Sequence, residues 1–326
     1  MIEIRYCTES WPIRGAFTLS RGSKHQADVI VVTLRTGNVI GCGECVPYSR
    51  YGESLASVMD QIASLHSDLR NGLDREALQH RLPAGAARNA LDCAFWDLEC
   101  KQHQQRIWQR LNYPAPASLE TAYTLSLDTP ERMRQAAIQH AHRPLLKLKL
   151  ADADDLARVA AVRAGAPLVR LVVDANEGWD VRRYLSLVPE LVTLGVTMIE
   201  QPFPAGSDDV LAELPRPIPV CADESCHDTP SLLPLSGRYD MINIKLDKTG
   251  GLTEALRLRR LALAQGLKIM VGCMVSTSLS MAPAFVVAQG AALVDLDGPL
   301  LLQRDRHNGL HYNDSEILPP DALLWG

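Results

Sequence analysis

The chain has 326 residues, of which 47% are hydrophobic, and it carries a formal net charge of −5. This length and apolar content are sufficient for a large core divided between two domains. A net negative charge without any basic run argues against nucleic-acid binding. The first five residues lack the charged and apolar regions of a signal peptide, and no apolar stretch is long enough to span a bilayer. We therefore expect a cytoplasmic globular protein with no nucleic-acid or membrane partner.

Eight cysteines occur as scattered single residues within apolar segments. This usage is typical of reduced thiols in the cytosol. Cys42 and Cys45 form a CxxC pair, but no second pair accompanies them. We therefore expect neither a zinc site nor a redox role for this pair.

Residues 1–115 form one compositional block, in which strand patterns precede helical ones. Two apolar runs at 29–34 and 39–42 flank a turn and predict a hairpin. Apolar periodicity predicts three helices, at 54–69, 74–80 and 84–104. Two polar and aromatic segments, 17–24 and 47–53, are either ordinary surface loops or lids that contribute specificity groups.

From residue 118 onward, strand and helix patterns alternate. Short apolar strands are predicted at 121–127, 145–150, 169–174, 197–200, 218–222, 241–245, 268–273 and 292–296. Amphipathic segments separate most of them, at 130–142, 154–164, 179–194 and 253–265. This alternation predicts an α/β fold, a barrel of the (β/α)₈ type. The alternative is an open doubly wound sheet, but no G-x-G-x-x-G motif opens a helix.

Charged residues recur at the carboxyl ends of these strands, where barrels place their chemistry. In chain order the strand ends carry Lys149, Asp174, Glu200, Asp223, Lys245, the segment 273–275 and Asp295. Lys147 shares a strand face with Lys149, because side chains two residues apart point to the same side. Two ammonium groups inside a barrel are costly unless anions lie beside them.

Three of these residues are acids on consecutive strands. Asp174, Glu200 and Asp223 cannot all stay ionised at close range without a cation. Oxygen donors with no histidine or cysteine nearby favour Mg²⁺ or Mn²⁺ over zinc. For Asp223 taken alone, the alternative is a helix N-cap.

Lys149 and Lys245 approach the acids from opposite sides. A lysine beside a second cation, here Lys147, can act as a base towards the α-proton of a metal-bound carboxylate. Two bases on opposite faces of one carbon predict a racemase or epimerase, whereas one base suits a dehydration or cycloisomerisation. A different mechanism would use Lys149 to form a Schiff base.

Five motifs together resemble the enolase superfamily and, within it, the muconate-lactonising subgroup. They are Lys147-Leu-Lys149 and the segments 173–176, 199–202, 222–225 and 243–245. The resemblance extends over nearly the whole chain. It implies a modified (β/α)₇β TIM-type barrel at 116–299 and an α+β capping domain at 1–115, completed by residues 300–326. It also implies Asp174, Glu200 and Asp223 as Mg²⁺ ligands, with Lys149 and Lys245 as the acid/base catalysts.

Asp295 and Asp297 distinguish among the reactions of this subgroup. In dipeptide epimerases, an Asp-x-Asp after the last strand binds the α-ammonium of the substrate, because a buried cation requires an anionic partner. The resemblance therefore implies epimerisation of L-Ala-D-Glu and L-Ala-L-Glu, fragments of the murein peptide recycled from the cell wall. N-acylamino acid racemisation, cycloisomerisation and a catalytically inactive binding protein are the alternatives. Lys147, Cys273 and Met274 are also expected beside the substrate.

The resemblance further implies that a basic residue from the first loop of the cap binds the glutamate side chain. Arg21 and Lys24 are both candidates, and the sequence leaves the choice open. Lys24 would supply a point charge rather than the bidentate fork of an arginine, which loosens selectivity for acidic side chains. Relatives of this fold also imply a homo-oligomer.

Overall fold

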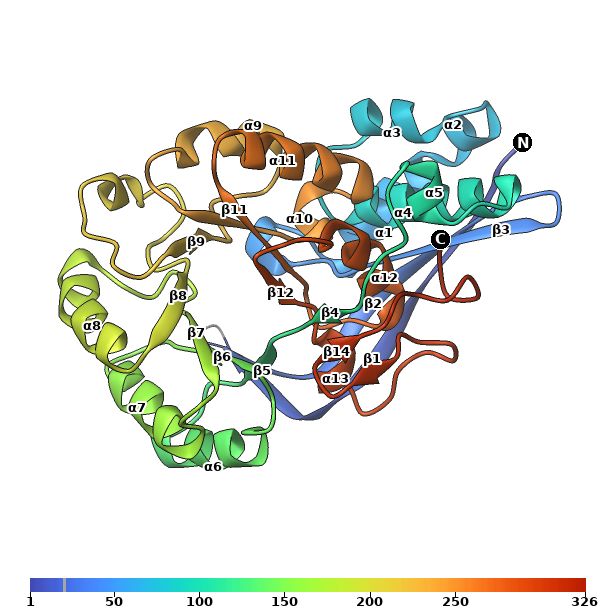
Figure 1. Ribbon diagram of the computed structural model, residues 1–326. Coiled ribbons are helices and arrows are strands. Elements are labelled where there is room, and N and C mark those ends of the chain that lie inside the picture. Colours follow the sequence, from blue (N-terminus) through green and yellow to red (C-terminus); the bar gives the residue numbers. More distant parts are fainter. Residues whose placement is uncertain (20–21) are drawn as a thin grey trace.

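An eight-stranded parallel sheet forms the centre of the protein in a computed structural model that describes residues 1–19 and 22–326 (Figure 1). Its strands are β5 (Tyr123–Leu125), β6 (Leu145–Lys149), β7 (Arg170–Asp174), β8 (Val196–Glu200), β9 (Val220–Ala222), β10 (Met241–Ile244), β11 (Lys268–Gly272) and β12 (Leu293–Asp295). They follow one another in chain order across the sheet. All eight predicted strands are thus confirmed.

The two ends of this sheet meet. The backbone N–H of Ala122, just before β5, donates to the carbonyl of Val294 in β12 at 2.8 Å. Leu296 donates to Thr121 Oγ1, also at 2.8 Å. A single buried apolar layer fills the interior, with one residue from or beside each strand: Ala122, Leu145, Val172, Met198, Cys221, Met241, Met270 and Leu293. The sheet is therefore a packed TIM-type barrel whose polar residues gather at the carboxyl ends of the strands.

Helices connect the barrel strands (Figure 1). They are α6 (Pro130–Gln139), α7 (Asp155–Gly165), α8 (Val181–Thr193), α9 (Thr229–Leu232), α10 (Leu246–Thr249), α11 (Leu252–Ala264) and α12 (Ser278–Val287). The link from β8 to β9 contains the 3₁₀ turn η2 (Asp209–Ala212), and α13 (Gly298–Leu301) follows the last strand. The four predicted amphipathic helices correspond to α6, α7, α8 and α11. Helix α12 was not predicted, because every one of its residues is buried and its sequence has no amphipathic period. The last barrel strand leads into the short α13 and then into the C-terminal tail, as in the (β/α)₇β form.

The N-terminal part is an antiparallel sheet of β1 (Glu3–Leu19), β2 (Gly22–Thr36) and β3 (Val39–Cys45). Helices cover it: α1 (Leu55–Ser64), α2 (His66–Arg70), α3 (Arg75–Arg81) and α4 (Ala86–His103), with a 3₁₀ turn η1 (Ser49–Tyr51) and α5 (Ile107–Arg110). The predicted hairpin is confirmed as β2–β3, whereas β1 was not predicted. The prediction of one helix over 54–69 was wrong, since the chain divides there into α1 and α2.

Helix α4 packs directly on β3 because two glycines leave room for its backbone. A Cβ atom added to Gly43 would lie 2.1 Å from the carbonyl oxygen of Ala90, and one added to Gly41 would lie 2.3 Å from that of Ala94. Such distances exclude any larger residue. The close contact fixes how the end of β3 is presented towards the barrel.

The segment 17–24, predicted as a loop, is mostly strand. Phe17 pairs with Lys24 and Leu19 with Gly22 as β1 and β2 continue into a long hairpin. Alternating polar and apolar residues there satisfy a strand as well as a loop. Residues 20 and 21 lie outside the described residues.

The tail after the barrel makes contacts with the N-terminal part. Its short strand β14 (Glu316–Ile317) pairs with β13 (Tyr312–Asn313) on one side and with β4 (Leu119–Glu120) on the other. Arg306 contacts the buried Glu44 at 2.6 Å and Glu9 at 2.7 Å. The limits of the two domains stay predictions. Within residues 1–19 and 22–326, the helices are all too short or too polar to cross a membrane.

Candidate active site

One cavity of about 500 Å³ lies at the carboxyl ends of the barrel strands, beneath the N-terminal hairpin. Its polar wall comes from the strand ends and the segments that follow them: Thr124, Lys147, Lys149, Asn176, Asp223, Glu224, Lys245, Asp295 and Asp297. Cys273 and Met274 line it as predicted, next to Val275. Two of the predicted site residues, Asp174 and Glu200, are fully buried beside this wall. The barrel thus brings the residues of eight strand ends to one place.

Lys147 holds three of the acids together. Its ammonium lies 2.6 Å from Glu200 Oε2, 2.7 Å from Asp295 Oδ2 and 3.4 Å from Asp174 Oδ2. Burial disfavours the charged amine, but the carboxylates of Asp295, Glu200 and Asp174 outweigh burial and raise its pKa well above the usual range. Lys147 is therefore a fixed cation among these carboxylates. The effect predicted for its charge on Lys149 stays a prediction.

Lys149 reaches the same group of acids from β6. Its ammonium contacts Asp174 Oδ2 at 2.5 Å, and the backbone N–H of Asn176 donates to the other oxygen of Asp174 at 2.9 Å. Burial alone would raise the pKa of Asp174, yet Lys149 and Lys147 hold it below its ordinary value. Asp174 is thus ionised and oriented by contacts to both of its oxygens.

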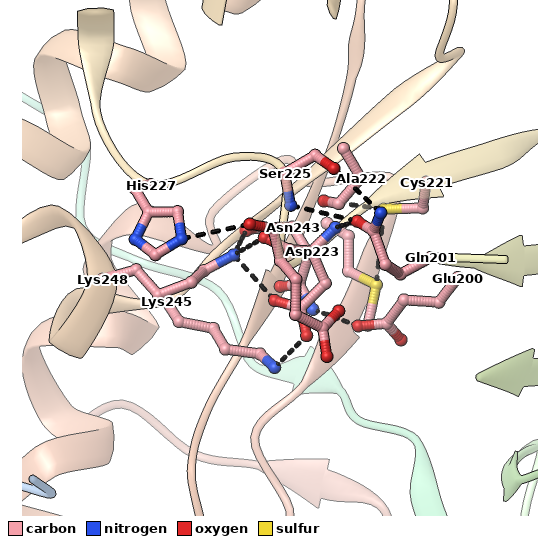
Figure 2. Close-up of polar contacts among 12 residues, drawn as sticks. Glu200, Gln201, Cys221, Ala222, Asp223, Ser225, His227, Asn243, Lys245 and Lys248 are labelled. Atoms are coloured by element: carbon pink, nitrogen blue, oxygen red, sulfur yellow. Dashed lines mark hydrogen bonds and ion pairs between the residues drawn. The ribbon is translucent and has the colours of Figure 1, made fainter. Parts of the chain in front are cut away.

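Asp223 has two lysine partners on one short segment (Figure 2). Lys245 Nζ lies 2.6 Å from Asp223 Oδ2, and Lys248 Nζ lies 2.7 Å from Asp223 Oδ1. Although burial opposes ionisation, these two ammonium groups hold the pKa of Asp223 well below its usual range. The same contact raises the pKa of Lys245 well above the usual range against the effect of its burial.

Glu200 lies between these two sides of the site. Burial, followed by the charge of Asp174, raises its pKa to about 7. Asn243 Nδ2 from β10 donates to Glu200 Oε1 at 2.7 Å (Figure 2). Asn243 therefore orients the carboxyl group of Glu200 from β10, two strands away in the sheet. Of the three predicted metal ligands, Glu200 has the charge that is least neutralised by its neighbours.

Gln201 connects the end of β8 to the segment after β9 (Figure 2). Its backbone takes a left-handed conformation, with φ of 36°. Its side-chain oxygen accepts from the backbone N–H groups of Asp223 at 2.9 Å and Ser225 at 3.1 Å. This link sets the separation of Glu200 and Asp223 along the barrel edge.

The three acids have the donor chemistry of a Mg²⁺ site. Asp174, Glu200 and Asp223 offer only carboxylate oxygens, from adjacent strand ends and in full burial. Among the described residues, no three histidine, cysteine, aspartate or glutamate side chains are grouped closely enough to hold a metal ion in this conformation. Each carboxylate instead contacts a lysine at 2.5 to 2.6 Å. The donor set therefore fits a divalent cation that displaces the lysine ammonium groups from these carboxylates.

The predicted ammonium-binding pair, Asp295 and Asp297, lines the same cavity at and just after the end of β12. Asp295 is 4% exposed, and its Oδ1 atom has no hydrogen-bond partner within the described part of the chain. The backbone N–H of Thr124 donates to Asp297 Oδ2 at 2.6 Å. Burial, followed by the charge of Asp295, raises the pKa of Asp297 to about 7. A buried carboxylate oxygen without a donor is suited to receive a cationic group from a ligand.

The N-terminal part covers the cavity on the side away from the barrel strands. Lys24 on β2 lines it, with its ammonium 5.5 Å from the centre of the Tyr48 ring. Tyr51, from the 3₁₀ turn η1, also lines it. The segment 47–53 therefore lines the cavity, and its contribution of specificity groups stays a prediction. Arg21, the other candidate for the glutamate side chain, lies outside the described residues.

Sequence reasoning missed several residues of this site. Lys248 and Asn243 were given no role, although both contact the predicted metal ligands. Thr124 was treated only as part of a strand. Lys248 had one visible signal, because it repeats a lysine three residues after Lys245. Thr124 contacts the site through its backbone N–H and Asn243 through a neutral amide, so neither contributes to the charge pattern of the sequence.

The CxxC pair takes no part in this cavity, since neither Cys42 nor Cys45 lines it. Both are free cysteines, and burial raises the pKa of each thiol. A raised pKa disfavours the thiolate that zinc binding and redox chemistry require.

Comparison with known proteins supports this fold and identifies the family. Residues 1–111 match the family described as mandelate racemase / muconate lactonizing enzyme, N-terminal domain, and residues 129–323 match the enolase C-terminal domain-like family. The chain is 45% identical to L-Ala-D/L-Glu epimerase of Escherichia coli (strain K12), over 97% of this chain and 99% of that protein. It is 46% identical to N-acetyl-D-glutamate racemase of a Pseudoalteromonas species, over 91% and 95%.

Solved structures show the same similarity. One is an enolase family member from Agrobacterium tumefaciens with homology to dipeptide epimerases, containing bound sodium and L-Ala-L-Glu. It is 50% identical, with a TM-score of 0.98, over 100% of both chains. Another is a dipeptide epimerase from Enterococcus faecalis complexed with Mg and L-Leu-L-Tyr, which is 26% identical with a TM-score of 0.91 over 98% and 97%.

The barrel and its acidic strand ends define an enolase-type enzyme. The chain belongs to the mandelate racemase / muconate lactonizing enzyme family of the enolase superfamily.

Proposed function

We propose that this protein is a Mg²⁺-dependent dipeptide epimerase that inverts the α-carbon of the C-terminal residue, with L-Ala-D-Glu and L-Ala-L-Glu as substrates. One observation carries the proposal. Lys149 and Lys245 both line the cavity, and they contact different members of one group of three buried carboxylates. A pair of bases on either side of an acidic cluster is suited to remove a proton from one face of a carbon and return it to the other.

The proposal assigns Asp174, Glu200 and Asp223 as the ligands of Mg²⁺, for which Mn²⁺ can substitute. When bound, the cation supplies stabilisation of the negative charge that develops on the substrate carboxylate. The structure of the Enterococcus faecalis epimerase, which contains Mg and a dipeptide, supports this choice.

Lys149 and Lys245 exchange the proton in this proposal. Each ammonium is paired with a carboxylate, at 2.5 Å for Lys149 and 2.6 Å for Lys245. An amine held in this way is a poor base. Each lysine therefore becomes a base only when its carboxylate partner is engaged elsewhere, which couples proton transfer to assembly of the complete site.

Asp295 and Asp297 bind the α-ammonium of the dipeptide, and Lys24 or Arg21 binds the glutamate side chain. The Oδ1 atom of Asp295 supports the first assignment, since it is a buried acceptor without a hydrogen-bond partner among the described residues, on a side chain that lines the cavity. The position of Lys24 on the cavity wall supports the second. Cys273 and Met274 form an apolar wall between the site for the α-ammonium and the site for the glutamate side chain.

The experiment that tests this function is proton NMR of L-Ala-L-Glu in D₂O with the protein and Mg²⁺, with and without EDTA. We expect loss of the glutamate α-proton signal together with appearance of the L,D diastereomer, both abolished by EDTA. Exchange without inversion would contradict the two-base assignment. Absence of exchange with this substrate and with a wider panel of dipeptides would contradict the function.

Racemisation of an N-acylated glutamate is the second candidate. Two observations favour it: a 46% identical relative is an N-acetyl-D-glutamate racemase, and Lys147 already neutralises one oxygen of Asp295 at 2.7 Å. A neutral amide N–H can donate to Asp295 without bringing a charge. The same NMR measurement with N-acetyl-L-glutamate compares the two substrates, and a larger kcat/KM for the dipeptide supports the first proposal.

The proposal places the enzyme in the cytoplasm, in the metabolism of murein peptides recycled from the cell wall. The relatives named as epimerases of L-Ala-D/L-Glu support this context. Assembly into a homo-oligomer stays a prediction, and light scattering of the purified protein would test it.

A further inference from the structure

The two sides of the site share an arrangement that the proposed roles do not explain. On one side, Asp174 contacts Lys149 at 2.5 Å and the more buried Lys147 at 3.4 Å. On the other, Asp223 contacts Lys245 at 2.6 Å and Lys248 at 2.7 Å. Each proposed base thus shares its carboxylate with a second lysine. Lys147 reaches the cavity wall, whereas Lys248 does not line the cavity at all.

Lys248 is held entirely by acceptors of the protein (Figure 2). Its ammonium donates to Asp223 Oδ1 at 2.7 Å, to the carbonyl of Asp223 at 2.5 Å and to the carbonyl of Asn243 at 2.9 Å. An ammonium group has three donors, and these contacts use all of them. The side chain has no exposed surface. A lysine in this state is rare unless it is paired, because an unpaired buried charge is strongly destabilising.

These contacts connect two of the proposed metal ligands. Lys248 fixes both the carboxylate and the backbone of Asp223, and it also holds the backbone of Asn243. The side chain of Asn243 in turn donates to Glu200 Oε1 at 2.7 Å. One ammonium group therefore ties the ends of β9 and β10 together and orients the carboxylates of two strands.

We propose that Lys248 is a positioning residue for Asp223. Lys248 keeps the Oδ1 atom of Asp223 occupied and its Oδ2 atom directed into the site, so that Lys245 is free to leave Oδ2. The proposal rests on the assigned function for the roles of Asp223 and Lys245. Without Lys248, Lys245 would be the sole ammonium partner of Asp223 among the described residues. Lys245 would then have to serve both as an anchor and as a base.

The sign of the effect on metal binding separates positioning from simple electrostatics. Removing a positive charge beside a cation site should by itself strengthen binding of the cation. Removing a residue that orients a metal ligand typically weakens metal binding about 10- to 100-fold. The variant Lys248→Met retains most of the side-chain volume and removes the charge. Direct titration with MgCl₂ by calorimetry therefore distinguishes the two effects without using any enzyme activity.

We expect Lys248→Met to bind Mg²⁺ about 10- to 100-fold more weakly than the wild type. At saturating Mg²⁺, we also expect its α-proton exchange to fall more for the epimer that depends on Lys245, as identified with Lys245→Met, than for the other. Lys248→Gln, which can still donate to the two carbonyls, provides a second variant without the charge. Circular dichroism and the melting temperature establish that each variant is folded.

Thr249→Val is the matched control. Thr249 is the buried neighbour of Lys248 in α10, and its hydroxyl donates to carbonyls of Leu246 and Gly251 without contacting Asp223. Unchanged or tighter Mg²⁺ binding in both Lys248 variants would overturn the proposal, as would an equal loss in Thr249→Val. If the wild type exchanges no dipeptide α-proton but the Lys248 variants still bind Mg²⁺ more weakly, the assigned reaction fails while the positioning role stands.

Discussion

The charged end of the barrel and the N-terminal hairpin line the same cavity, but they are built differently. At the barrel, charged groups are buried and paired with one another at 2.5 to 2.7 Å. On the hairpin, Lys24 is exposed, and its ammonium lies 5.5 Å from the centre of the Tyr48 ring. Buried paired charges permit few substitutions, whereas exposed strand tips accept many. The comparison suggests that the barrel determines the reaction and the hairpin tunes the substrate.

The largest effect is expected from Asp174→Asn at the barrel end. This change removes the charge that contacts Lys149 at 2.5 Å, together with one proposed Mg²⁺ ligand. Stabilisation by a bound metal is worth several kcal/mol, so the epimerisation rate should fall by about 1,000-fold or more. The rate is measured by NMR with L-Ala-L-Glu at saturating Mg²⁺.

The control for this prediction is Asp152→Asn, which removes an aspartate paired with Arg158 at 2.6 Å outside the cavity. Its activity should match the wild type. A rate within tenfold of the wild type in Asp174→Asn would show that the barrel acids do not carry the chemistry.

A smaller loss is expected from Asp295→Asn, and it should depend on the substrate. Hydrogen bonds to charged groups contribute about 1.5–3 kcal/mol, which corresponds to a loss of about 10- to 100-fold in kcat/KM for a dipeptide ammonium. For N-acetyl-L-glutamate the loss should be much smaller, because no ammonium is present. Equal losses for the two substrates would show that Asp295 does not bind the ammonium group.

The pKa of Asp297 predicts a pH dependence of substrate binding. Burial and then Asp295 raise this pKa to about 7, so the group is protonated below that pH. A neutral carboxyl cannot pair with an ammonium, and kcat/KM for dipeptides should therefore fall as the pH decreases through about 7. Asp297→Asn should flatten this limb of the profile. Persistence of the limb in the variant would assign it to another group.

The smallest effect is expected on the hairpin. An exposed ion pair contributes about 0.2–1 kcal/mol, so Lys24→Met should raise KM for L-Ala-L-Glu by no more than about fivefold and leave kcat unchanged. KM for L-Ala-L-Leu, which lacks the side-chain carboxylate, should not change. A loss of kcat for both dipeptides would place Lys24 in the chemistry and remove the contrast between hairpin and barrel.

The barrel was predictable because its signals are regular. Each strand is a short apolar run, and the charges fall where each run ends. The sequence alone therefore placed Lys149, Asp174, Glu200 and Lys245 at the carboxyl ends of the strands. All of them reach the same cluster. The charge of Lys147 beside them was also expected, although its simultaneous contact with Asp174, Glu200 and Asp295 was not.

The remainder lacked such signals for physical reasons. Helix α12 is buried on all sides and so has no polar face to mark its period. The division between α1 and α2 at Leu65 follows no glycine or proline. Lys248 was given no role, because its three acceptors are a carboxylate oxygen and two carbonyls that only the fold brings together.

The central claim is that Lys149 and Lys245 are two bases on opposite faces of one carbon. The most direct test measures α-proton exchange in D₂O for L-Ala-L-Glu and L-Ala-D-Glu separately, with Lys149→Met and with Lys245→Met. We predict that neither variant epimerises, that each exchanges the proton of one epimer only, and that the two variants act on opposite epimers. Inversion by either variant, or exchange of the same epimer by both, would contradict the account.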